Sequence, residues 1–465
     1  MILKQYYLGC LSQASYLIGD ETTRTAVVVD PRRDVEEYLE DAAEAGLRIE
    51  HVILTHFHAD FVAGHLELHE RTGARIYLGA PATAEYEFSP LADGAVLEFG
   101  QVRLTILQTP GHTPEAVSVL VFDLAKDREH PQAVLTGDTL FIGDVGRPDL
   151  MASVGASAED LAGQLYDSVH RLLQLPDDTL VYPGHGAGSA CGKNLSSETV
   201  STIGVQRREN CSLQPMSKES FVKLVTTDQP KAPSYFGYDA QLNRRRRSTL
   251  EAALARELTA LPLDAVLRAQ REDGAQILDV RDPDDYAASH LAGSTNITLK
   301  SRFASWAGAL LTPARPIVIV AVPGSEHEAA VRLGRIGFDN VLGHLAGGID
   351  AARGRPDVVR RGRRVTSAEL VDAVRQGPLT LVDVRFPGEW AQGAIPGAVH
   401  IPLDQLEERL AEIPRGGRVA VYCQSGLRSS TAASLLEGAG FDDVVDLIGG
   451  YATWSTTADG VAAAR

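Results

Sequence analysis

The C-terminal half of the chain contains an internal repeat of about 104 residues, and this repeat restricts the fold more than any other sequence feature. Residues 277–281 (Ile-Leu-Asp-Val-Arg) recur as residues 381–385 (Leu-Val-Asp-Val-Arg), and residues 337–341 recur as residues 440–444. A repeat this long predicts two duplicated domains, because solenoid repeats span only roughly 20 to 50 residues. Residues 354–364, rich in Arg with Gly and Pro, predict the linker between the two copies.

The N-terminal half alternates short apolar runs with amphipathic stretches, a pattern typical of an α/β domain with helices outside paired sheets. The apolar runs predict strands at residues 26–29, 51–54, 75–78, 102–107, 117–122, 133–135 and 179–182. Helices are expected over residues 34–45, with Asp34 as the N-cap, and over residues 159–173. Because 465 residues exceed one hydrophobic core, we expect three α/β domains, at residues 1–245, 255–355 and 365–465.

Composition limits the partners and the location of the protein. A net charge of −17 disfavours nucleic acid, whose phosphates would repel the chain. Membrane spans need ~18 consecutive apolar residues, and no run approaches that length, so no membrane association is expected. The start of the chain lacks the basic and apolar regions of a signal peptide. Four cysteines form no disulfide framework, which favours free thiols in the cytoplasm.

The four arginines at residues 244–247 predict a solvated helix start, with an interface role as the alternative.

Residue types that bind metals gather after the strand-like run that ends at Leu54. His56, His58 and Asp60 follow at spacings of two residues, which places imidazole and carboxylate ligands close together at a strand end. Three more candidates, each ending an apolar stretch, are His112, Asp138 and His185. Lone histidines outside these segments are expected to be solvated surface residues: His65, His69, His170 and His400.

The order of these motifs resembles the metallo-β-lactamase superfamily, whose signature His-x-His-x-Asp-His builds two adjacent metal sites. Phe61 stands where the last His of that signature belongs, and a benzene ring cannot bind such a cation. The resemblance therefore implies an αββα sandwich with one metal. We expect the metal ligands to be His56, His112 and Asp138. The residues expected to orient these ligands or a bound water are His58, Asp60 and His185.

Two His and one carboxylate form the ligand set typical of non-haem Fe(II) oxygenases. With residues 109–113, 136–139, 146–149 and 182–185, the N-terminal domain resembles persulfide dioxygenases, and the chain resembles bacterial fusions of that enzyme with rhodanese domains. The resemblance implies one Fe(II) per chain. It also implies oxidation by O₂ of a small persulfide, such as glutathione persulfide, to sulfite and a thiol. Arg147 would contact the carboxylate of the thiol carrier, and a structural ion pair is its alternative role.

A second centre of chemistry is predicted at Cys423, which only the second copy of the repeat carries. It ends a β-branched run and precedes a short loop and an Ala-rich helix, where backbone N–H groups and Arg428 would favour a thiolate. The loop resembles the active site of rhodanese sulfurtransferases. It implies transfer of sulfane sulfur through Cys423, forming or using thiosulfate. The remaining loop residues expected to contact substrate are Gln424, Ser425, Gly426 and Leu427.

The first copy aligns with residues 318–326 against the Cys423 segment and has no cysteine nearby. Pro323 also removes one backbone N–H donor from its loop. We therefore interpret this copy as a catalytically silent rhodanese domain.

Cys191 follows His185 in a loop rich in small residues that we expect to cover the metal pocket. The functional hypothesis is that Cys191 takes sulfane sulfur near the iron, helped by Lys193. The alternative is a cysteine that only fills a gap.

Two other functions stay open. One is a thiolester hydrolase similar to hydroxyacylglutathione hydrolase, with Zn²⁺, and the other is a sulfide sensor with vestigial sites. We expect a cytoplasmic homo-oligomer.

Overall fold

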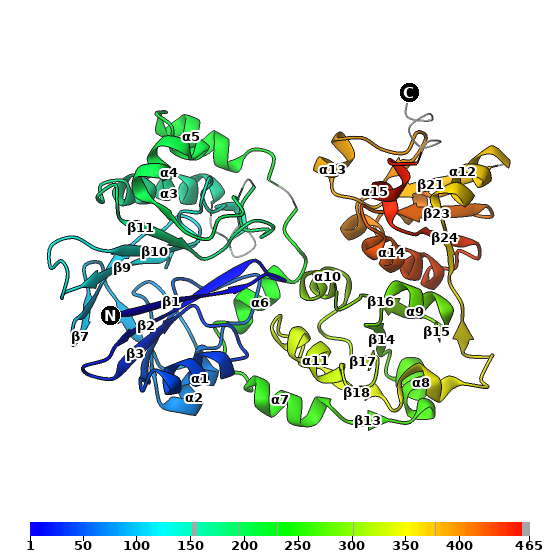
Figure 1. The fold of residues 1–465 in the computed structure, drawn as a ribbon, viewed down its shortest axis with the longest axis horizontal. Helices are drawn as coiled ribbons and strands as arrows, with labels where there is room; N and C mark the ends of the chain where they lie inside the picture. Colours follow the sequence, from blue (N-terminus) through cyan, green and yellow to red (C-terminus); the bar gives the residue numbers. More distant parts are fainter. Residues whose placement is uncertain are drawn as a thin grey trace. The chain divides into compact units, whose positions relative to one another are not determined.

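The computed structural model describes residues 1–150, 155, 157–193, 195–229, 231–300, 302–376 and 378–457 (Figure 1). The chain divides into two compact units. The N-terminal unit comprises Met1–Ala252 with Gly334–Gly337, and the C-terminal unit comprises Ala253–Leu333 and Phe338–Arg465. Both copies of the repeat belong to the C-terminal unit, apart from that short segment. Among the described residues, no helix combines the length and apolar character needed to cross a bilayer.

The N-terminal unit contains two six-stranded sheets. The first has the order β1 (Ile2–Leu8), β2 (Gln13–Asp20), β3 (Thr25–Val29), β4 (Arg48–Ile53), β5 (Arg75–Gly79), β6 (Ser89–Leu91). The second has the order β12 (Ser201–Thr202), β11 (Leu180–Pro183), β10 (Ala133–Gly137), β9 (Val117–Asp123), β8 (Val102–Gln108), β7 (Val96–Phe99). Its helices are α1 (Glu36–Glu44), α2 (His65–Thr72), α3 (Ala158–Leu172), α4 (Ile203–Glu209), α5 (Lys218–Thr226), α6 (Phe236–Leu242) and the start of α7 (Leu250–Glu257).

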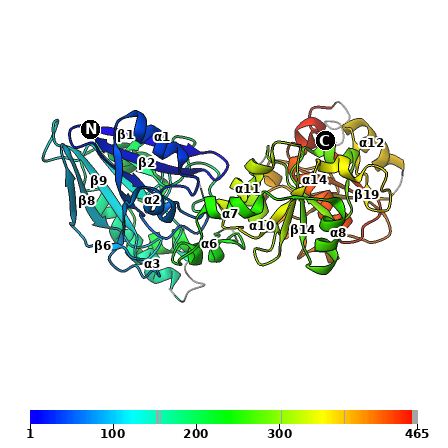
Figure 2. The ribbon, with the colours of Figure 1, turned by 90° about the horizontal axis from the view of Figure 1, so that it is seen from below.

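The sheets pack face to face and helices cover their outer faces, so the unit is an αββα sandwich, as expected (Figure 1). Alternate residues of β2, β3, β8 and β9 fill the core between the sheets, including Ile18, Val27, Leu104 and Val119. A second core lies between the second sheet and helices α3, α4 and α5. Figure 2 shows the blue strands β1 and β2 beside the cyan strands β8 and β9 from a second direction.

Every strand predicted in this half is present, with bounds that differ by a few residues at most. The predicted N-cap of α1 was wrong. Helix α1 begins at Glu36 after Val35, which makes no side-chain cap. The Asp34 carboxylate is instead held by the Arg32 guanidinium, at 3.1 Å, so it is not available to the helix N–H groups.

The arginines at residues 244–247 follow α6, and the prediction that they are solvated was wrong for two of them. The Arg247 side chain is 5% exposed and pairs with Glu67, which also pairs with the buried Arg33. The Arg244 guanidinium lies 4.9 Å from the ring centre of Phe57. The arginines therefore fasten the segment after α6 to the N-terminal unit.

His65 was also expected on the surface, but it is fully buried at the start of α2. Neither ring nitrogen has a hydrogen-bond partner among the described residues. Burial, aided by the nearby Arg247 charge, lowers the pKa of His65 to about 3. His69 and His170 are exposed, as expected.

Replacing Glu67 with Ala is expected to lower the free energy of unfolding by about 3 kcal/mol, because two buried guanidinium groups lose their carboxylate. Burial alone would raise the pKa of Glu67, but Arg247 and Arg33 outweigh it and lower the pKa from 4.5. This stabilisation is present above pH 4.5 and is lost as the pH falls through the folded-state pKa. Urea unfolding of the parental protein and the variant at pH 7.5 measures the loss of stability. The same comparison at pH 4 should show a smaller difference in the free energy of unfolding. Glu36→Ala, which removes an exposed ion pair with Arg71, is the control and should change stability by less than about 0.5 kcal/mol.

The C-terminal unit confirms the repeat, because each copy contains a parallel five-stranded sheet of the same order. The first copy has β13 (Ala260–Leu261), β18 (Val341–Leu345), β17 (Ile317–Val320), β14 (Gln276–Asp279), β16 (Ser294–Asn296). The second has β20 (Arg363–Val365), β24 (Val444–Leu447), β23 (Arg418–Tyr422), β21 (Leu379–Asp383), β22 (Val399–His400). The helices are α8 (Leu263–Glu272), α9 (Pro283–Ala288), α10 (Phe303–Leu310), α11 (Glu326–Gly334), α12 (Ser367–Gln376), α13 (Pro387–Ala391), α14 (Leu427–Gly438) and α15 (Gly450–Trp454).

The segment expected to be a linker, residues 354–364, is partly built into the sheets. Its β19 (Val359–Arg360) pairs with β15 (His290–Leu291) of the first copy, and Arg363 already begins β20 of the second copy. Arginine-rich composition indicated the domain boundary but not these backbone pairings.

Candidate functional site

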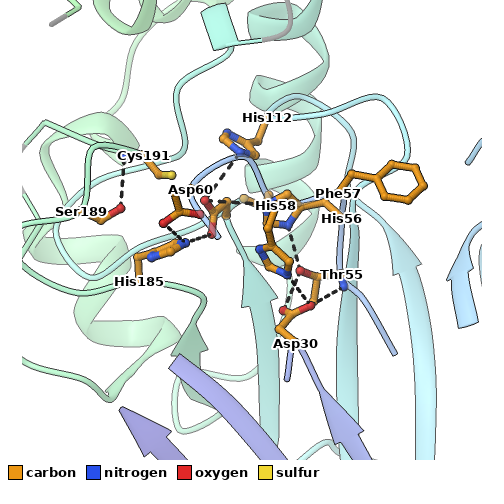
Figure 3. A network of polar contacts seen from close by, with 12 residues as sticks. Asp30, Thr55, His56, Phe57, His58, Asp60, His112, His185, Ser189 and Cys191 are labelled. Atoms are coloured by element: carbon orange, nitrogen blue, oxygen red, sulfur yellow. Dashed lines mark hydrogen bonds and ion pairs between the residues drawn. The ribbon is translucent and has the colours of Figure 1, made fainter. Parts of the chain in front are cut away.

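The six candidate metal ligands lie together, although they come from four separate loops. His56, His58 and Asp60 follow β4, and His112, Asp138 and His185 follow β8, β10 and β11 in turn. All six are buried. Figure 3 shows the side chains of His56, His112, Asp60 and His185 converging, with the sulfur of Cys191 directed at the same space.

His56, His112 and Asp138 form one group able to hold a metal. Oδ2 of Asp138 lies 3.5 Å from Nε2 of His112 and 3.8 Å from Nε2 of His56. The opposite ring nitrogens are already used, at 2.9 Å from the Thr55 hydroxyl for His56 and 2.9 Å from the Arg147 carbonyl for His112. Both Nε2 atoms are thereby directed at the carboxylate.

The donor set fits a bound metal. Neither carboxylate oxygen of Asp138 has a hydrogen-bond partner among the described residues, although the side chain is buried. Unpartnered buried carboxylates are destabilising, and a cation would satisfy both oxygens. Burial, together with the neighbouring histidines, holds the pKa of His56 well below its usual 6.5. His56 is therefore neutral, the form of imidazole that binds metals.

His58, Asp60 and His185 form a second group of potential ligands. Nε2 of His185 lies 3.5 Å from Oδ2 of Asp60 and 3.5 Å from Oδ1 of Asp138, so it contacts the carboxylate of the first group. Nε2 of His58 lies 2.9 Å from a carboxylate oxygen of Asp30, whereas its buried Nδ1 has no hydrogen-bond partner among the described residues and is the ring atom left for the second group. This geometry is compatible with the expected orienting role of the three residues.

Phe61 lies beside this second group. Its ring centre is 4.3 Å from that of His58 and 6.5 Å from that of His185, and the side chain is 1% exposed. An apolar ring thus stands next to two imidazoles.

Asp30 is a site residue that the sequence motifs missed. Its buried carboxylate accepts hydrogen bonds from the Thr55 N–H and hydroxyl, both at 2.8 Å, as well as contacting His58. Thr55 in turn contacts His56, so Asp30 supports both histidines of the motif. The available signal was its place directly after the predicted strand 26–29, where an acidic residue before a proline ends an apolar run.

Asp30→Ala is expected to weaken metal retention by about 10- to 100-fold, because second-layer carboxylates fix the tautomer and direction of ligating histidines. Metal analysis after timed dialysis against a chelator measures this loss. Asp20→Ala is the matched control, since Asp20 is a buried, hydrogen-bonded aspartate of the same sheet outside the metal groups. Equal metal loss in both variants would show a general effect of destabilisation.

Arg147 forms the ion pair that was its alternative role. Its Nη2 lies 2.6 Å and its Nε 2.8 Å from the two carboxylate oxygens of Asp149, and its Nη1 donates to the Ala190 carbonyl at 3.2 Å. The side chain is buried. A substrate carboxylate would therefore share this guanidinium with Asp149.

Cys191 is buried and belongs to a third group of potential ligands with Asp138 and His185. Burial, and then the charges of Asp60 and Asp138, raise the pKa of the thiol well above 9.0. The expected help from Lys193 is not present, because its amino group donates to the Thr227 carbonyl. The Lys193 amino group is thus directed at Thr227 and not at the Cys191 sulfur.

The Cys423 loop lies at the N-terminus of α14. The Gly426 N–H donates to the Cys423 sulfur at 3.1 Å, and the Ser429 hydroxyl lies 3.6 Å from it. Gly426 has a φ of 90°, a left-handed conformation that favours glycine. Arg428 pairs with Glu389 at 2.6 and 2.7 Å, which holds its positive charge beside the loop.

The neighbouring loop residues are fixed by the second copy itself. The Gln424 side-chain oxygen accepts from Arg385 at 3.3 Å, and the backbone carbonyls of Cys423 and Gln424 accept N–H groups of α15. His400 is not the solvated histidine that was expected. It stacks on Trp390, and its Nε2 lies 2.9 Å from the Arg385 carbonyl.

The loop of the first copy that corresponds to the Cys423 loop has different side chains. Strand pairing places Val320 opposite Asp279 and Tyr422 opposite Asp383, so Ala321 corresponds to Cys423. In place of a sulfur, the Glu326 carboxylate accepts the Gly324 N–H at 2.8 Å. Glu326 stands at the position of Arg428, so the charge next to the loop is reversed.

Comparisons with known proteins agree with this architecture. Residues 8–185 match the model of the metallo-beta-lactamase superfamily, and residues 263–354 and 366–457 each match that of the rhodanese-like domain. The human mitochondrial persulfide dioxygenase ETHE1 is 31% identical over 250 residues, covering 53% of this chain and 88% of that protein. A beta-lactamase hydrolase-like protein of Xylella fastidiosa (strain 9a5c) is 28% identical, over 46% of this chain and 52% of that protein.

One solved structure matches a larger part of the chain. A metallo-beta-lactamase from Staphylococcus aureus subsp. aureus COL is 30% identical, with a TM-score of 0.66, and the match covers 74% of this chain and 98% of that one.

Proposed function

This chain belongs to the metallo-β-lactamase superfamily, with persulfide dioxygenase homologues, and continues into two rhodanese-like domains; we propose that it oxidises a low-molecular-weight persulfide to sulfite and transfers sulfane sulfur through Cys423. The proposed oxidation is RSSH + O₂ + H₂O → RSH + SO₃²⁻ + 2H⁺, with glutathione persulfide as the candidate substrate. Its homologues and its rhodanese domains place the protein in sulfur metabolism.

The observation that supports this proposal is the group of His56, His112 and Asp138. Its two imidazole nitrogens face a carboxylate whose oxygens lack hydrogen-bond partners among the described residues. Two His and one carboxylate are the usual ligands of non-haem Fe(II), which when bound would supply the redox chemistry with O₂. Phe61 offers no ligand where the signature has its last histidine, so one iron per chain is proposed.

The other buried residues would control access to the reacting sulfur. Phe61 supplies an apolar wall, and closely packed apolar walls keep water from reactive groups. We assign Cys191, whose sulfur faces Asp138 and His185, to contact with the substrate sulfur. Arg147 is assigned to the carboxylate of the thiol carrier, in competition with Asp149.

In the second copy, the Cys423 thiolate would attack the outer sulfur of thiosulfate, giving a cysteine persulfide and releasing sulfite. The sulfur would remain in the cradle of the Gly426 N–H and the start of α14, where positive ends of peptide dipoles stabilise an anion. The reverse step would join sulfite from the first reaction to sulfane sulfur and give thiosulfate.

The iron proposal is tested with protein purified without oxygen. We expect about one iron per chain, as a metal with two His and one carboxylate requires, and O₂ uptake with glutathione persulfide that yields sulfite. Two metals per chain, both needed for activity, would contradict the single-iron proposal. Zinc with hydrolysis of S-lactoylglutathione would favour the thiolester hydrolase. In Phe61→His, an unchanged metal count would show that Phe61 does not decide the number of metals.

A further inference from the structure

Helix α14, which begins at the Cys423 loop, is held by a residue of the first copy. Asn296 ends β16, and its side-chain oxygen accepts a hydrogen bond from the Ser430 hydroxyl at 2.7 Å. Its backbone N–H donates to the Ser434 hydroxyl at 3.0 Å. Ser430 and Ser434 lie one helical turn apart on one face of α14, and all three residues are buried.

Asn296 is itself fixed by the first copy. Its side-chain N–H groups donate to the carbonyls of Asp279 and Arg281, both at 3.0 Å. Arg281 forms a bidentate ion pair with Asp279, as Arg385 does with Asp383 in the second copy. The first copy therefore keeps the Asp-x-Arg arrangement although it has no cysteine, and that arrangement holds Asn296.

The same position in the second copy has a different residue. Strand pairing places Asn296 opposite Asp279 and His400 opposite Asp383. His400 also contacts the carbonyl of its Asp-x-Arg arginine, Arg385, at 2.9 Å. The asparagine side chain is what allows the first copy to reach Ser430, whereas Ser434 is reached by the backbone N–H of the same residue.

The position of α14 determines the surroundings of the Cys423 sulfur. The Gly426 N–H, directly before the helix, donates to the sulfur at 3.1 Å, and the Ser429 hydroxyl in the first turn lies 3.6 Å from it. Ser430 is the next residue. A shift of the helix at Ser430 therefore displaces both groups relative to the sulfur.

A second contact between the copies involves an arginine that lies beside the Cys423 loop. Arg364 pairs with the buried Asp446 at 2.8 Å and also with Asp284, which lies in α9 of the first copy. An atom of its guanidinium lies 3.4 Å from where a Cβ on Gly426 would be. Asp284 of the first copy thus contacts an arginine of the second copy that lies beside the Cys423 loop.

We infer that the first rhodanese copy, which has no cysteine, positions the sulfurtransferase site of the second copy, and that Asn296 is its main positioning residue. The inference rests on the proposed role of Cys423. It gives a function to the Asp-x-Arg arrangement that the silent copy shares with the second copy, and this function needs no chemistry in the loop of the silent copy.

The test compares single polar side-chain deletions in the full-length protein, assayed for sulfur transfer from thiosulfate to cyanide. Ser430→Ala should lower kcat and kcat/KM about threefold, and Asn296→Ala about tenfold, with KM for thiosulfate changed less than about twofold. Ser430→Thr, which keeps the hydroxyl, should recover most of the rate. Ser294→Ala is the matched control, because it removes a buried hydroxyl bond to the Leu291 carbonyl within the first copy, and it should keep the parental rate.

Parental rates in both Ser430→Ala and Asn296→Ala would overturn the inference, and so would an equal loss in Ser294→Ala. Persulfide-dependent O₂ uptake and the thermal unfolding temperature report whether each variant is folded. A parental protein that transfers no sulfur would instead overturn the proposed function of Cys423.

Discussion

Cys423→Ser is expected to lower sulfur transfer from thiosulfate to cyanide by at least about 10³-fold, because a hydroxyl is a far weaker nucleophile than a thiolate held in a cradle of N–H groups. The Gly426 N–H lies 3.1 Å from the sulfur, and a serine oxygen there would keep a similar position without the reactivity. Persulfide-dependent O₂ uptake should stay within about twofold of the parental rate, because the candidate iron ligands belong to the other unit. Thiocyanate formation and an oxygen electrode measure the two activities.

Two further variants accompany this prediction, one as a control and one as a test of the first copy. Cys211→Ser removes the exposed cysteine and should leave both activities unchanged. Ala321→Cys, added to Cys423→Ser, should not restore transfer, because the Glu326 carboxylate already accepts the Gly324 N–H and Pro323 offers no donor. Transfer at the parental rate by Cys423→Ser would exclude the loop as the site, and transfer by the double variant would show that the first copy is not silent.

Asp138→Ala is expected to reduce bound iron to a small fraction and to lower persulfide-dependent O₂ uptake by about 10³-fold, since it removes the carboxylate of a facial two-His-one-carboxylate set. The carboxylate is the group that both Nε2 atoms of His56 and His112 face. Sulfur transfer through Cys423 should be unchanged. Iron analysis and O₂ uptake on anaerobically purified protein test the prediction.

Asp60→Ala is the matched comparison, because Asp60 is a buried aspartate that contacts His185 but lies outside the His56 group. We expect it to retain most of the iron, with retention weakened by about tenfold. Equal loss of iron in Asp60→Ala and Asp138→Ala would place the metal between the two groups and contradict the ligand assignment.

The local sequence was sufficient to predict which reactive side chains lie at the ends of strands. His56, His112, Asp138 and Cys423 each end an apolar strand-like run, and side chains at strand ends meet at the same edge of a sheet. The repeat likewise predicted two copies of one domain, because similar residues at similar spacing form similar strands. The sequence by itself therefore determined the αββα unit, the duplicated domains and the residues that gather in the candidate metal groups.

Only the tertiary structure decided which of the other polar residues are buried and what they contact. Arg247 and Glu67 are 180 residues apart, and Asn296 and Ser430 are 134 apart, so no local pattern relates them. Asp30 was missed for the same reason, since its partners arrive from the next strand. A side chain's burial depends on which distant segments pack around it, whereas strand and helix periodicity depends on neighbouring residues alone.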